Sequence, residues 1–409
     1  MKTSMRVKAA SDEMPRKRRV MLVGPWKWTV GGVTTFMLNL VESPLAASNA
    51  FLRFNTARPA KRNVTDNYGY AAIFRGGIAR VLSGAIVTLF HLAAFPFVLL
   101  YRRPDIVQVQ SSDFQVFWES AAYVQMCRMF RIPVVMRLGG SFDHFYAASS
   151  VRAQAAIRRV LQWPDRLIVQ SEYWRRFVAG VGRTNGVFVV GNAVPESLTV
   201  PLSRPQRPVP VCLFVAGSNA TWKGFDEVRQ AMVLLETSGV RVHCRVIGAT
   251  QSLMRRVASD DGPRNMLLEG HVDHAEIISA MRSADIFLLP SHSEGFPNAL
   301  IEAMATGLAC IVTPVGAVPE IIGADAAIVV PVKDAGALAD AIRQLAGDPA
   351  LRGSLGQAAQ DTVSTRYAQS AVLPRLEQGW QLLLDDKSTL FHLCIARKRS
   401  GPNDGEPGR

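Results

Sequence analysis

Two glutamates, Glu294 and Glu302, lie in a segment whose composition suits ligand binding. Residues 285–289 form an apolar run typical of a buried strand, and residues 291–307 follow it with the sequence SHSEGFPNALIEAMATG. The proline suits the first turn of a helix, and the last glycine suits a helix end. The pattern predicts a loop with Glu294 and a helix with Glu302 a little over one turn in. Both carboxylates could then project towards one cleft and accept hydrogen bonds from sugar and ribose hydroxyls.

The start of this predicted helix also offers backbone donors. The amides of the first helical turn have no partner within a helix, and the N-terminus attracts anions. The segment therefore predicts a diphosphate site; a capped, solvated helix with two ordinary glutamates is the alternative. The residues that would form the site are Gly295, Phe296, Pro297, Asn298 and Ala299, with the amides of Phe296, Asn298 and Ala299 exposed.

Lys223 follows another apolar run, residues 211–215, and lies in the sequence ATWKG beyond Gly217 and Ser218. A lysine there suits phosphate oxygens, which need a positive charge and hydrogen-bond donors. An ordinary surface lysine is the alternative.

Two glycines, Gly31 and Gly32, follow the first apolar run and open a stretch of helical periodicity. Glycines let a backbone approach a phosphate closely. A plain tight turn explains them equally well, and the absence of GxGxxG argues against a dinucleotide site.

Short apolar runs alternate with helical periodicity through all 409 residues. This alternation predicts an α/β fold with parallel sheets covered on both faces. We expect two doubly wound, Rossmann-like domains that face a central cleft. The predicted strands are residues 20–23, 106–109, 134–138, 167–169, 187–190, 211–215, 242–247, 266–268, 286–289, 310–312 and 328–330.

A proline-rich stretch separates the two halves. We expect a basic tail over 1–18, a first domain over 19–195, a linker over 196–210, a second domain over 211–365, a helix over 366–387 that packs back on the first domain, and a tail over 388–409.

The net charge of +13 is partly due to the basic first nineteen residues. No zinc-finger spacing, homeodomain-like helix or RRM signature accompanies it, so no nucleic-acid partner is predicted. The five cysteines are scattered without CxxC spacing and suit buried positions in a reducing compartment. The start lacks the apolar segment of a signal peptide, so we expect the cytoplasm or the inner face of the membrane.

Residues 81–101 carry no Asp, Glu, Lys or Arg and are flanked by arginines. Their length would allow a membrane crossing. A crossing would, however, place the strands before and after it on opposite sides of the bilayer. We therefore favour a buried or membrane-surface helix, and with the basic N-terminus it would provide peripheral membrane contact. A buried helix with a solvated tail is the alternative.

The segment EGFPNALIEAMATG, with Glu294 and Glu302 seven residues apart, resembles the E-x7-E motif of retaining glycosyltransferases of family four, the "glycosyl transferases group 1". Its flanks ADIFLLPS and VGAVPEII are also similar to that family, and the resemblance extends from about residue 19 to about 380. It implies the GT-B fold and transfer of a hexose, with retention, from a UDP- or GDP-sugar without a metal. The donor would bind the C-terminal domain, and a glycan or lipid-linked acceptor the N-terminal domain, in cell-surface polysaccharide biosynthesis.

The resemblance also implies roles for single residues. Glu294 would contact the donor sugar, Glu302 the ribose and Lys223 the diphosphate. The loop with Gly31 and Gly32 would lie over the phosphates. Asn192 resembles an asparagine of the domain junction, a hinge or structural position.

Two positions depart from the family. Ser218 stands where an arginine is common, and a histidine expected directly after residues 134–138 is absent. His144 follows later and Arg137 precedes, and either could serve the diphosphate or the leaving group. A GT-B sugar-nucleotide epimerase and a degenerate binding or scaffold subunit remain alternatives to a transferase.

Overall fold

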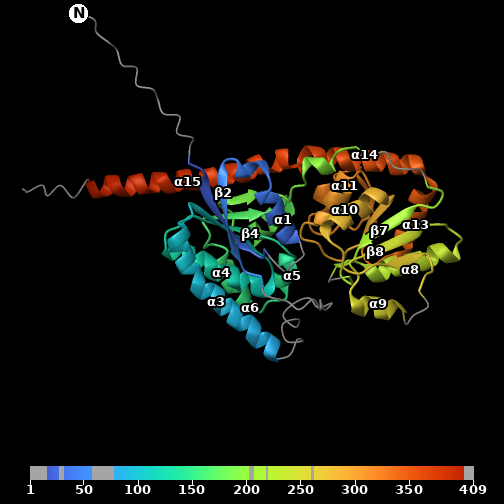
Figure 1. Ribbon diagram of the computed structural model, residues 1–409, viewed down its shortest axis with the longest axis horizontal. Coiled ribbons are helices and arrows are strands. Elements are labelled where there is room, and N and C mark those ends of the chain that lie inside the picture. Colours follow the sequence, from blue (N-terminus) through green and yellow to red (C-terminus); the bar gives the residue numbers. More distant parts are fainter. Residues whose placement is uncertain are drawn as a thin grey trace, which may run out of the picture.

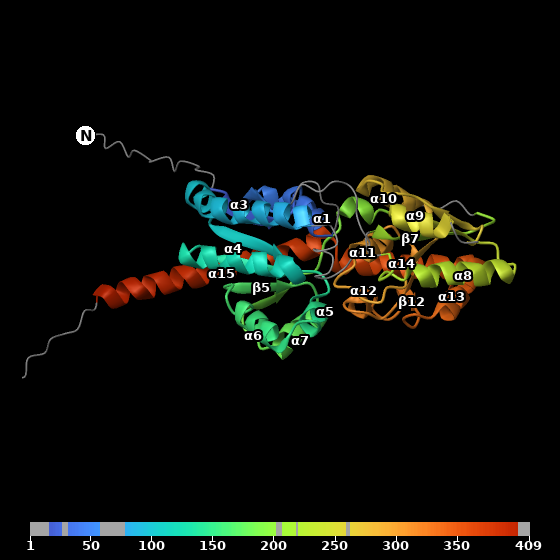
Figure 2. The same cartoon turned by 90° about the horizontal axis from the view of Figure 1, so that it is seen from below.

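The computed structural model describes residues 16–26, 32–57, 78–201, 207–217, 220–258 and 262–399, with residues 78–80 and 386–399 described as backbone only. The described chain forms two six-stranded parallel sheets, which confirms the predicted α/β class. Figures 1 and 2 show the two sheets with their helices as separate domains that lie side by side.

The sheet of the N-terminal domain has the order β2-β1-β3-β4-β5-β6. Neighbouring strands are parallel throughout, with Val20 of β1 opposite Ile106 of β3. The strands are β1 (Arg18–Gly24), β2 (Asn49–Asn55), β3 (Ile106–Ser111), β4 (Val134–Leu138), β5 (Arg166–Val169) and β6 (Val187–Val189).

Helices cover both faces of this sheet because strand side chains alternate between the faces. Met21 and Val23 pack on one face with side chains of α3 to α7, whereas Val20 and Leu22 pack on the other with α1 and α15. The helices are α1 (Gly32–Val41), α3 (Ile78–Arg102), α4 (Phe114–Met129), α5 (Phe142–Ala147), α6 (Val151–Val160) and α7 (Glu172–Gly180), with short 3-10 turns η1 (Pro44–Ala46) and η2 (Glu196–Leu198).

The sheet of the C-terminal domain has the order β12-β11-β10-β7-β8-β9. Its strands are β7 (Val211–Val215), β8 (His243–Ile247), β9 (Met266–Leu268), β10 (Ile286–Leu289), β11 (Ala309–Val312) and β12 (Ala327–Val329). Its helices are α8 (Phe225–Thr237), α9 (Gln251–Ala258), α10 (His274–Ser283), α11 (Asn298–Ala305), α12 (Val318–Ile322), α13 (Ala335–Gly347) and α14 (Pro349–Arg366).

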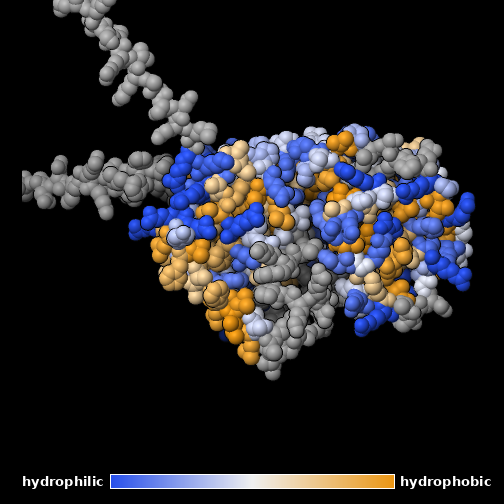
Figure 3. Space-filling view, viewed as in Figure 1, coloured by the Kyte–Doolittle hydropathy of each residue, from blue (hydrophilic) through white to orange (hydrophobic). Residues whose placement is uncertain are grey.

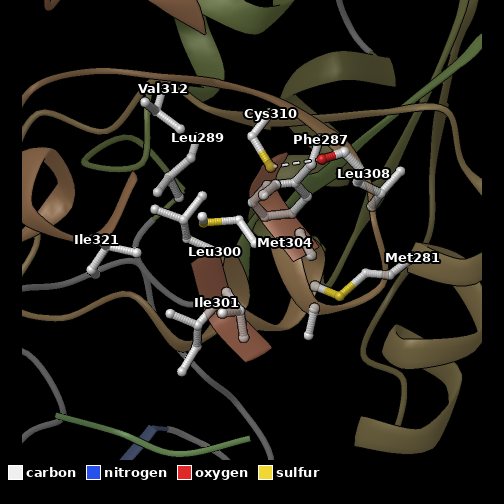
Figure 4. Close-up of a cluster of buried hydrophobic side chains, with 14 of the residues drawn as sticks. Met281, Phe287, Leu289, Leu300, Ile301, Met304, Leu308, Cys310, Val312 and Ile321 are labelled. Atoms are coloured by element: carbon white, nitrogen blue, oxygen red, sulfur yellow. Dashed lines mark hydrogen bonds between the residues drawn. The ribbon is translucent and has the colours of Figure 1, made fainter. Parts of the chain in front are cut away.

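A dense apolar core fixes α11 in the C-terminal domain. Leu300 and Met304 of this helix are fully buried among Phe287 and Leu289 of β10 and Cys310 of β11. Figure 4 shows these side chains converging between the helix and the strands. Because interiors are packed to crystal density, the position of the helix start is set by this core.

Helix α15 (Gln369–Arg399) leaves the C-terminal domain and runs along the N-terminal domain (Figures 1 and 2). Trp380 is fully buried, contacts the ring of Phe51 at 6.1 Å and donates from Nε1 to Oε1 of Gln108 at 2.9 Å. The helix extends past the expected end at 387 because residues 380–399 contain neither Gly nor Pro.

Helix α3 is not buried, although burial is one of the two placements expected for residues 81–101, beside a membrane-surface helix. Phe95 and Leu99 pack into the domain, but most of residues 81–102 lie at the surface. The strands before and after it, β2 and β3, both pair with β1. The helix therefore lies along the domain. If α3 crossed a membrane, β2 and β3 would lie on opposite sides of the bilayer and could not both pair with β1.

Candidate active site

The carboxyl edges of the two sheets meet at two glycine loops. Gly140 follows β4 with a φ of +76°, and Gly295 follows β10. A Cβ added at Gly295 would lie 2.2 Å from the carbonyl oxygen of Gly140. This backbone approach admits no larger residue. The loop with the first glutamate thus rests directly on the N-terminal domain.

Helix α7 holds this junction from the N-terminal side. The Trp174 indole donates to the carbonyl oxygen of Gly295 at 2.8 Å. Glu320 of α12 accepts from the backbone N–H groups of Glu172 at 2.8 Å and Tyr173 at 3.3 Å. A carboxylate at a helix N-terminus is favourable because the free N–H groups and the helix dipole both attract it. Together these contacts fix the two domains against each other.

Glu294 lies half-buried in the loop between β10 and α11. Its Oε1 accepts from the Ser291 hydroxyl at 2.8 Å, and the carbonyl of Ser291 accepts from the Thr313 hydroxyl at 2.5 Å. Ser291 and Thr313 are fully buried. The buried Ser291 hydroxyl therefore orients the Glu294 carboxylate through Oε1. Its other oxygen, Oε2, could accept a hydrogen bond from a ligand hydroxyl.

Glu302 lies buried on α11, as predicted for a residue in the helix. Its Oε1 contacts Nε2 of His274, the first residue of α10, at 3.0 Å. The hydrogen bond to Glu302 raises the pKa of His274 above its usual value, against the opposing effect of burial. The sequence did not reveal this partner because 28 residues separate the two.

The raised pKa of His274 makes the stability contribution of this pair depend on pH. The contribution is fully present below the unfolded pKa of about 6.5 and is lost as the pH rises through the raised folded value. We expect His274→Gln to lower the free energy of unfolding by up to about 1 kcal/mol at pH 5.5. The loss at pH 8.5 should be smaller than the loss at pH 5.5. Urea unfolding at both pH values checks this. The matched control is His271→Gln at an exposed neighbour; a His274→Gln effect that is equal at both pH values contradicts the assignment.

Lys223 lies on a turn that is fastened to the Glu294 loop. The His292 N–H donates to the carbonyl of Trp222 at 2.8 Å. Gly224 has a φ of +83°, and a Cβ there would lie 2.1 Å from the carbonyl oxygen of Pro290. Nε2 of His292 further contacts Glu227 of α8 at 3.0 Å. Among the described residues, the Lys223 ammonium has no hydrogen bond or ion pair, so its charge is available to a ligand.

His144 is brought to the same turn from the other domain. It lies exposed on α5, and its ring contacts the Trp222 ring edge-on with centroids 5.4 Å apart. The structure therefore places His144 beside the neighbour of Lys223, across the domain junction.

Arg137, the other candidate from that region, is 2% exposed and does not reach the surface. Its guanidinium stacks 3.8 Å from the centroid of the Phe36 ring and donates to Oδ1 of Asn192 at 2.5 Å. Burial lowers its pKa to about 9. The Asn192 amide in turn donates to Oδ1 of Asn298, whose amide donates to the carbonyl of Gly32 at 3.2 Å. Arg137 is thus a buried residue that supports the contact between Asn192, Asn298 and Gly32 at the domain junction.

The starts of α1 and α11 meet through this last contact. A Cβ at Gly32 would lie 3.0 Å from Nδ2 of Asn298. Pro297 is the N-cap of α11, one residue before the predicted first turn. Within the described ranges, the amides of Phe296, Asn298 and Ala299 have no recorded partner, and the Phe296 ring packs on Tyr367 at 5.6 Å. Two helix N-termini therefore lie together, a favourable place for an anion.

The remaining predicted residues are placed in part. Gly217 follows β7 with a φ of +60°, and a Cβ there would meet nothing within 4 Å. Its open position suits the close approach of a ligand. Gly31 and Ser218 lie outside the described residues.

The C-terminal domain matches a known family. The family model "Glycosyl transferases group 1" matches residues 209–348. The chain is 28% identical over 170 residues to the capsular polysaccharide biosynthesis glycosyltransferase CapM of Staphylococcus aureus, covering 40% of this chain and 44% of CapM. The chain thus spans less than half the length of that relative.

Solved structures match over most of the chain. Sucrose-phosphate synthase from Thermosynechococcus elongatus has a TM-score of 0.73 at 17% identity and covers 90% of this chain and 100% of its own. Anabaena HepE in complex with UDP-glucose has a TM-score of 0.66 at 14% identity, covering 89% and 99%. At these identities the likeness is one of fold.

The two sheets and their facing edges define a GT-B protein of two Rossmann-like domains. Residues 209–348 of its C-terminal domain match the group 1 glycosyltransferases. The family recognised from the Glu294–Glu302 segment is thereby confirmed.

Proposed function

We propose that the chain transfers a hexose from a UDP- or GDP-sugar, with retention of configuration, to a glycan or lipid-linked acceptor. The observation that supports this proposal is the set of contacts around one segment, the β10–α11 loop with Glu294 and α11 with Glu302. The turn that carries Lys223 is hydrogen-bonded to this loop through His292 and Trp222, and Asn298 at the start of α11 contacts Gly32 at the start of α1. The carboxylates can accept hydrogen bonds from the hydroxyls of a nucleotide sugar. The ammonium group and the backbone amides can bind its diphosphate.

In the proposed reaction the acceptor oxygen bonds to the anomeric carbon while the bond from that carbon to the diphosphate oxygen breaks. The acceptor proton passes to the departing diphosphate, and both events occur on one face of the sugar. Lys223 and the helix N-termini stabilise the charge that develops on the diphosphate. His144 stands beside Lys223 and is proposed to assist the leaving group. These groups supply the positive charge, so the proposal includes no metal.

Glu294 is proposed to hold the transferred sugar, because Ser291 fixes one of its oxygens and leaves the other for a hydroxyl. Glu302 is proposed to hold the ribose, with His274 on its Oε1. The similarity to CapM, a capsular polysaccharide glycosyltransferase, supports a role in cell-surface polysaccharide biosynthesis. The complex of HepE with UDP-glucose favours a UDP-linked donor as the first to test. A position at the cytoplasmic face of the membrane is also part of the proposal.

Proton NMR of the transfer product tests the proposed reaction. UDP-glucose, UDP-N-acetylglucosamine and GDP-mannose, all α-linked donors, are incubated with the protein and a panel of glycan and lipid-linked acceptors. We expect one donor to yield an α-linked product, because the leaving and entering groups share one face. A β-linked product contradicts retention. Conversion of the donor to an epimer without acceptor indicates an epimerase, and tight donor binding without transfer or hydrolysis indicates a scaffold subunit.

A further inference from the structure

The outer face of α3 is apolar along its whole described length. Its large side chains recur three or four residues apart and therefore form one stripe. A surface helix of a globular protein carries polar residues on this face. The stripe contains Leu82, Ile86, Leu89, Phe90, Phe97, Leu100 and Tyr101, all between 57% and 83% exposed. Figure 3 shows it as an orange band along the lower left of the N-terminal domain. A continuous exposed apolar surface of this kind marks an interaction site.

The opposite face of α3 is anchored in the domain. Phe95 is fully buried between the rings of Phe54 and Tyr123. The centroid of the Phe95 ring lies 4.8 Å from the centroid of each of these rings. The helix is therefore held along the domain surface and presents its outer face outward. Its 25 residues span about 37 Å at 1.5 Å per residue. This is the geometry of a helix that lies in the plane of a membrane interface.

Positive charge gathers at one end of the stripe. α3 ends at Arg102, and Arg103 follows it directly. Two residues further on, Asp105 contacts the Arg16 guanidinium at 3.5 Å and accepts from the Arg19 backbone at 2.7 Å. Arg16 and Arg19 thus lie at this same edge.

We propose that the outer face of α3 docks on a bilayer with anionic headgroups, with its apolar side chains at the level of the upper acyl chains. A bilayer accounts for both the apolar stripe and the basic end, since each basic residue near an anionic surface adds about 1 kcal/mol of attraction. A second copy of this chain would account for the stripe alone.

The direction of α3 connects this surface to the domain junction. A helix that joins two parallel strands runs antiparallel to them. Helix α3 therefore begins at the carboxyl edge of the sheet and ends at its amino edge, where Arg102 and Arg103 lie. A docked N-terminal domain therefore holds its carboxyl edge close to the headgroups, where a lipid-linked acceptor would be presented. The docking goes beyond the proposed reaction and does not depend on the donor.

Vesicle co-sedimentation of the full chain tests the docking. The vesicles contain phosphatidylcholine alone or equal parts of phosphatidylcholine and phosphatidylglycerol. The double variant Leu89→Gln/Phe97→Gln removes two apolar side chains that are 65% and 74% exposed, so it spares the core. The matched control, Val233→Gln/Leu234→Gln, changes two exposed apolar residues of α8 in the other domain.

We expect the wild type and the α8 control to sediment with the mixed vesicles, and the α3 variant to partition at least about tenfold less. The variant Arg102→Gln/Arg103→Gln should weaken binding to the mixed vesicles more than binding to the phosphatidylcholine vesicles. A wild type that stays in solution, or an α3 variant that binds like the control, overturns the proposal. So does a lipid-free dimer, seen by light scattering, that the α3 variant abolishes, because the face then serves a second copy. Calorimetry with nucleotides separates the two proposals, since the α3 variant should keep the wild-type nucleotide affinity.

Discussion

Replacement of Lys223 by alanine is expected to lower kcat for sugar transfer by about 10²- to 10³-fold. In the proposed reaction the Lys223 ammonium stabilises charge that develops on the diphosphate, and removal of one such donor typically costs about 2.7 to 4 kcal/mol of transition-state stabilisation. The site has no spare cation at this turn, since Ser218 stands where the family commonly has an arginine. Steady-state kinetics with the donor identified by NMR provide the measurement.

Two further variants make the Lys223 result specific. Arg241→Ala removes an exposed cation two residues before β8, at the opposite edge of the same sheet, and should leave kcat unchanged. Lys223→Arg should recover part of the lost rate, because it restores the charge but not the shape of the ammonium. A Lys223→Ala variant with the turnover of the wild type would remove this residue from the mechanism.

The second large effect concerns stability. Trp380→Ala is expected to reduce the free energy of unfolding of the N-terminal domain by about 3 to 5 kcal/mol. Trp380 is fully buried, completes the second face of the N-terminal sheet and satisfies Oε1 of Gln108. Its removal leaves a cavity and a lost hydrogen bond in a core made by distant parts of the chain. Urea unfolding monitored by circular dichroism gives the value.

The control for this prediction lies on the same helix. Leu382 is 41% exposed, so Leu382→Ala tests the helix without the core and should cost less than about 1 kcal/mol. Equal effects of Trp380→Ala and Leu382→Ala would show that α15 contributes no packing to the N-terminal domain.

The sequence predicted the fold well where local patterns decide it. Buried central strands form continuous apolar runs, and eleven of the twelve strands in the described part of the chain coincide with predicted runs. The edge strand β2 escaped prediction because it is only half-buried and carries Arg53, which stacks 4.8 Å from the centroid of the Trp26 ring. An edge strand needs no regular apolar alternation, so its pattern is weak.

The site was predictable only in its local part. The order of loop, helix start and helix end around Glu294 and Glu302 follows from proline and glycine chemistry within one segment. The long-range contacts of this segment do not, because His274 reaches Glu302, and Trp174 reaches the carbonyl of Gly295, through tertiary packing. Arg137 illustrates the limit most clearly. Its type suggests an anion ligand, yet its contacts with Phe36 and Asn192 place it under the junction, where no local pattern could locate it.

Isothermal titration calorimetry of UDP, GDP and ADP with the full chain tests the central claim most directly, namely that a nucleotide diphosphate binds at a site that includes Glu302 and Lys223. We predict selective binding of one of the three nucleotides, clearly weakened in both Glu302→Ala and Lys223→Ala and unchanged in Arg241→Ala. Failure of all three nucleotides to bind, or binding that neither site variant weakens, would contradict the assignment of this site.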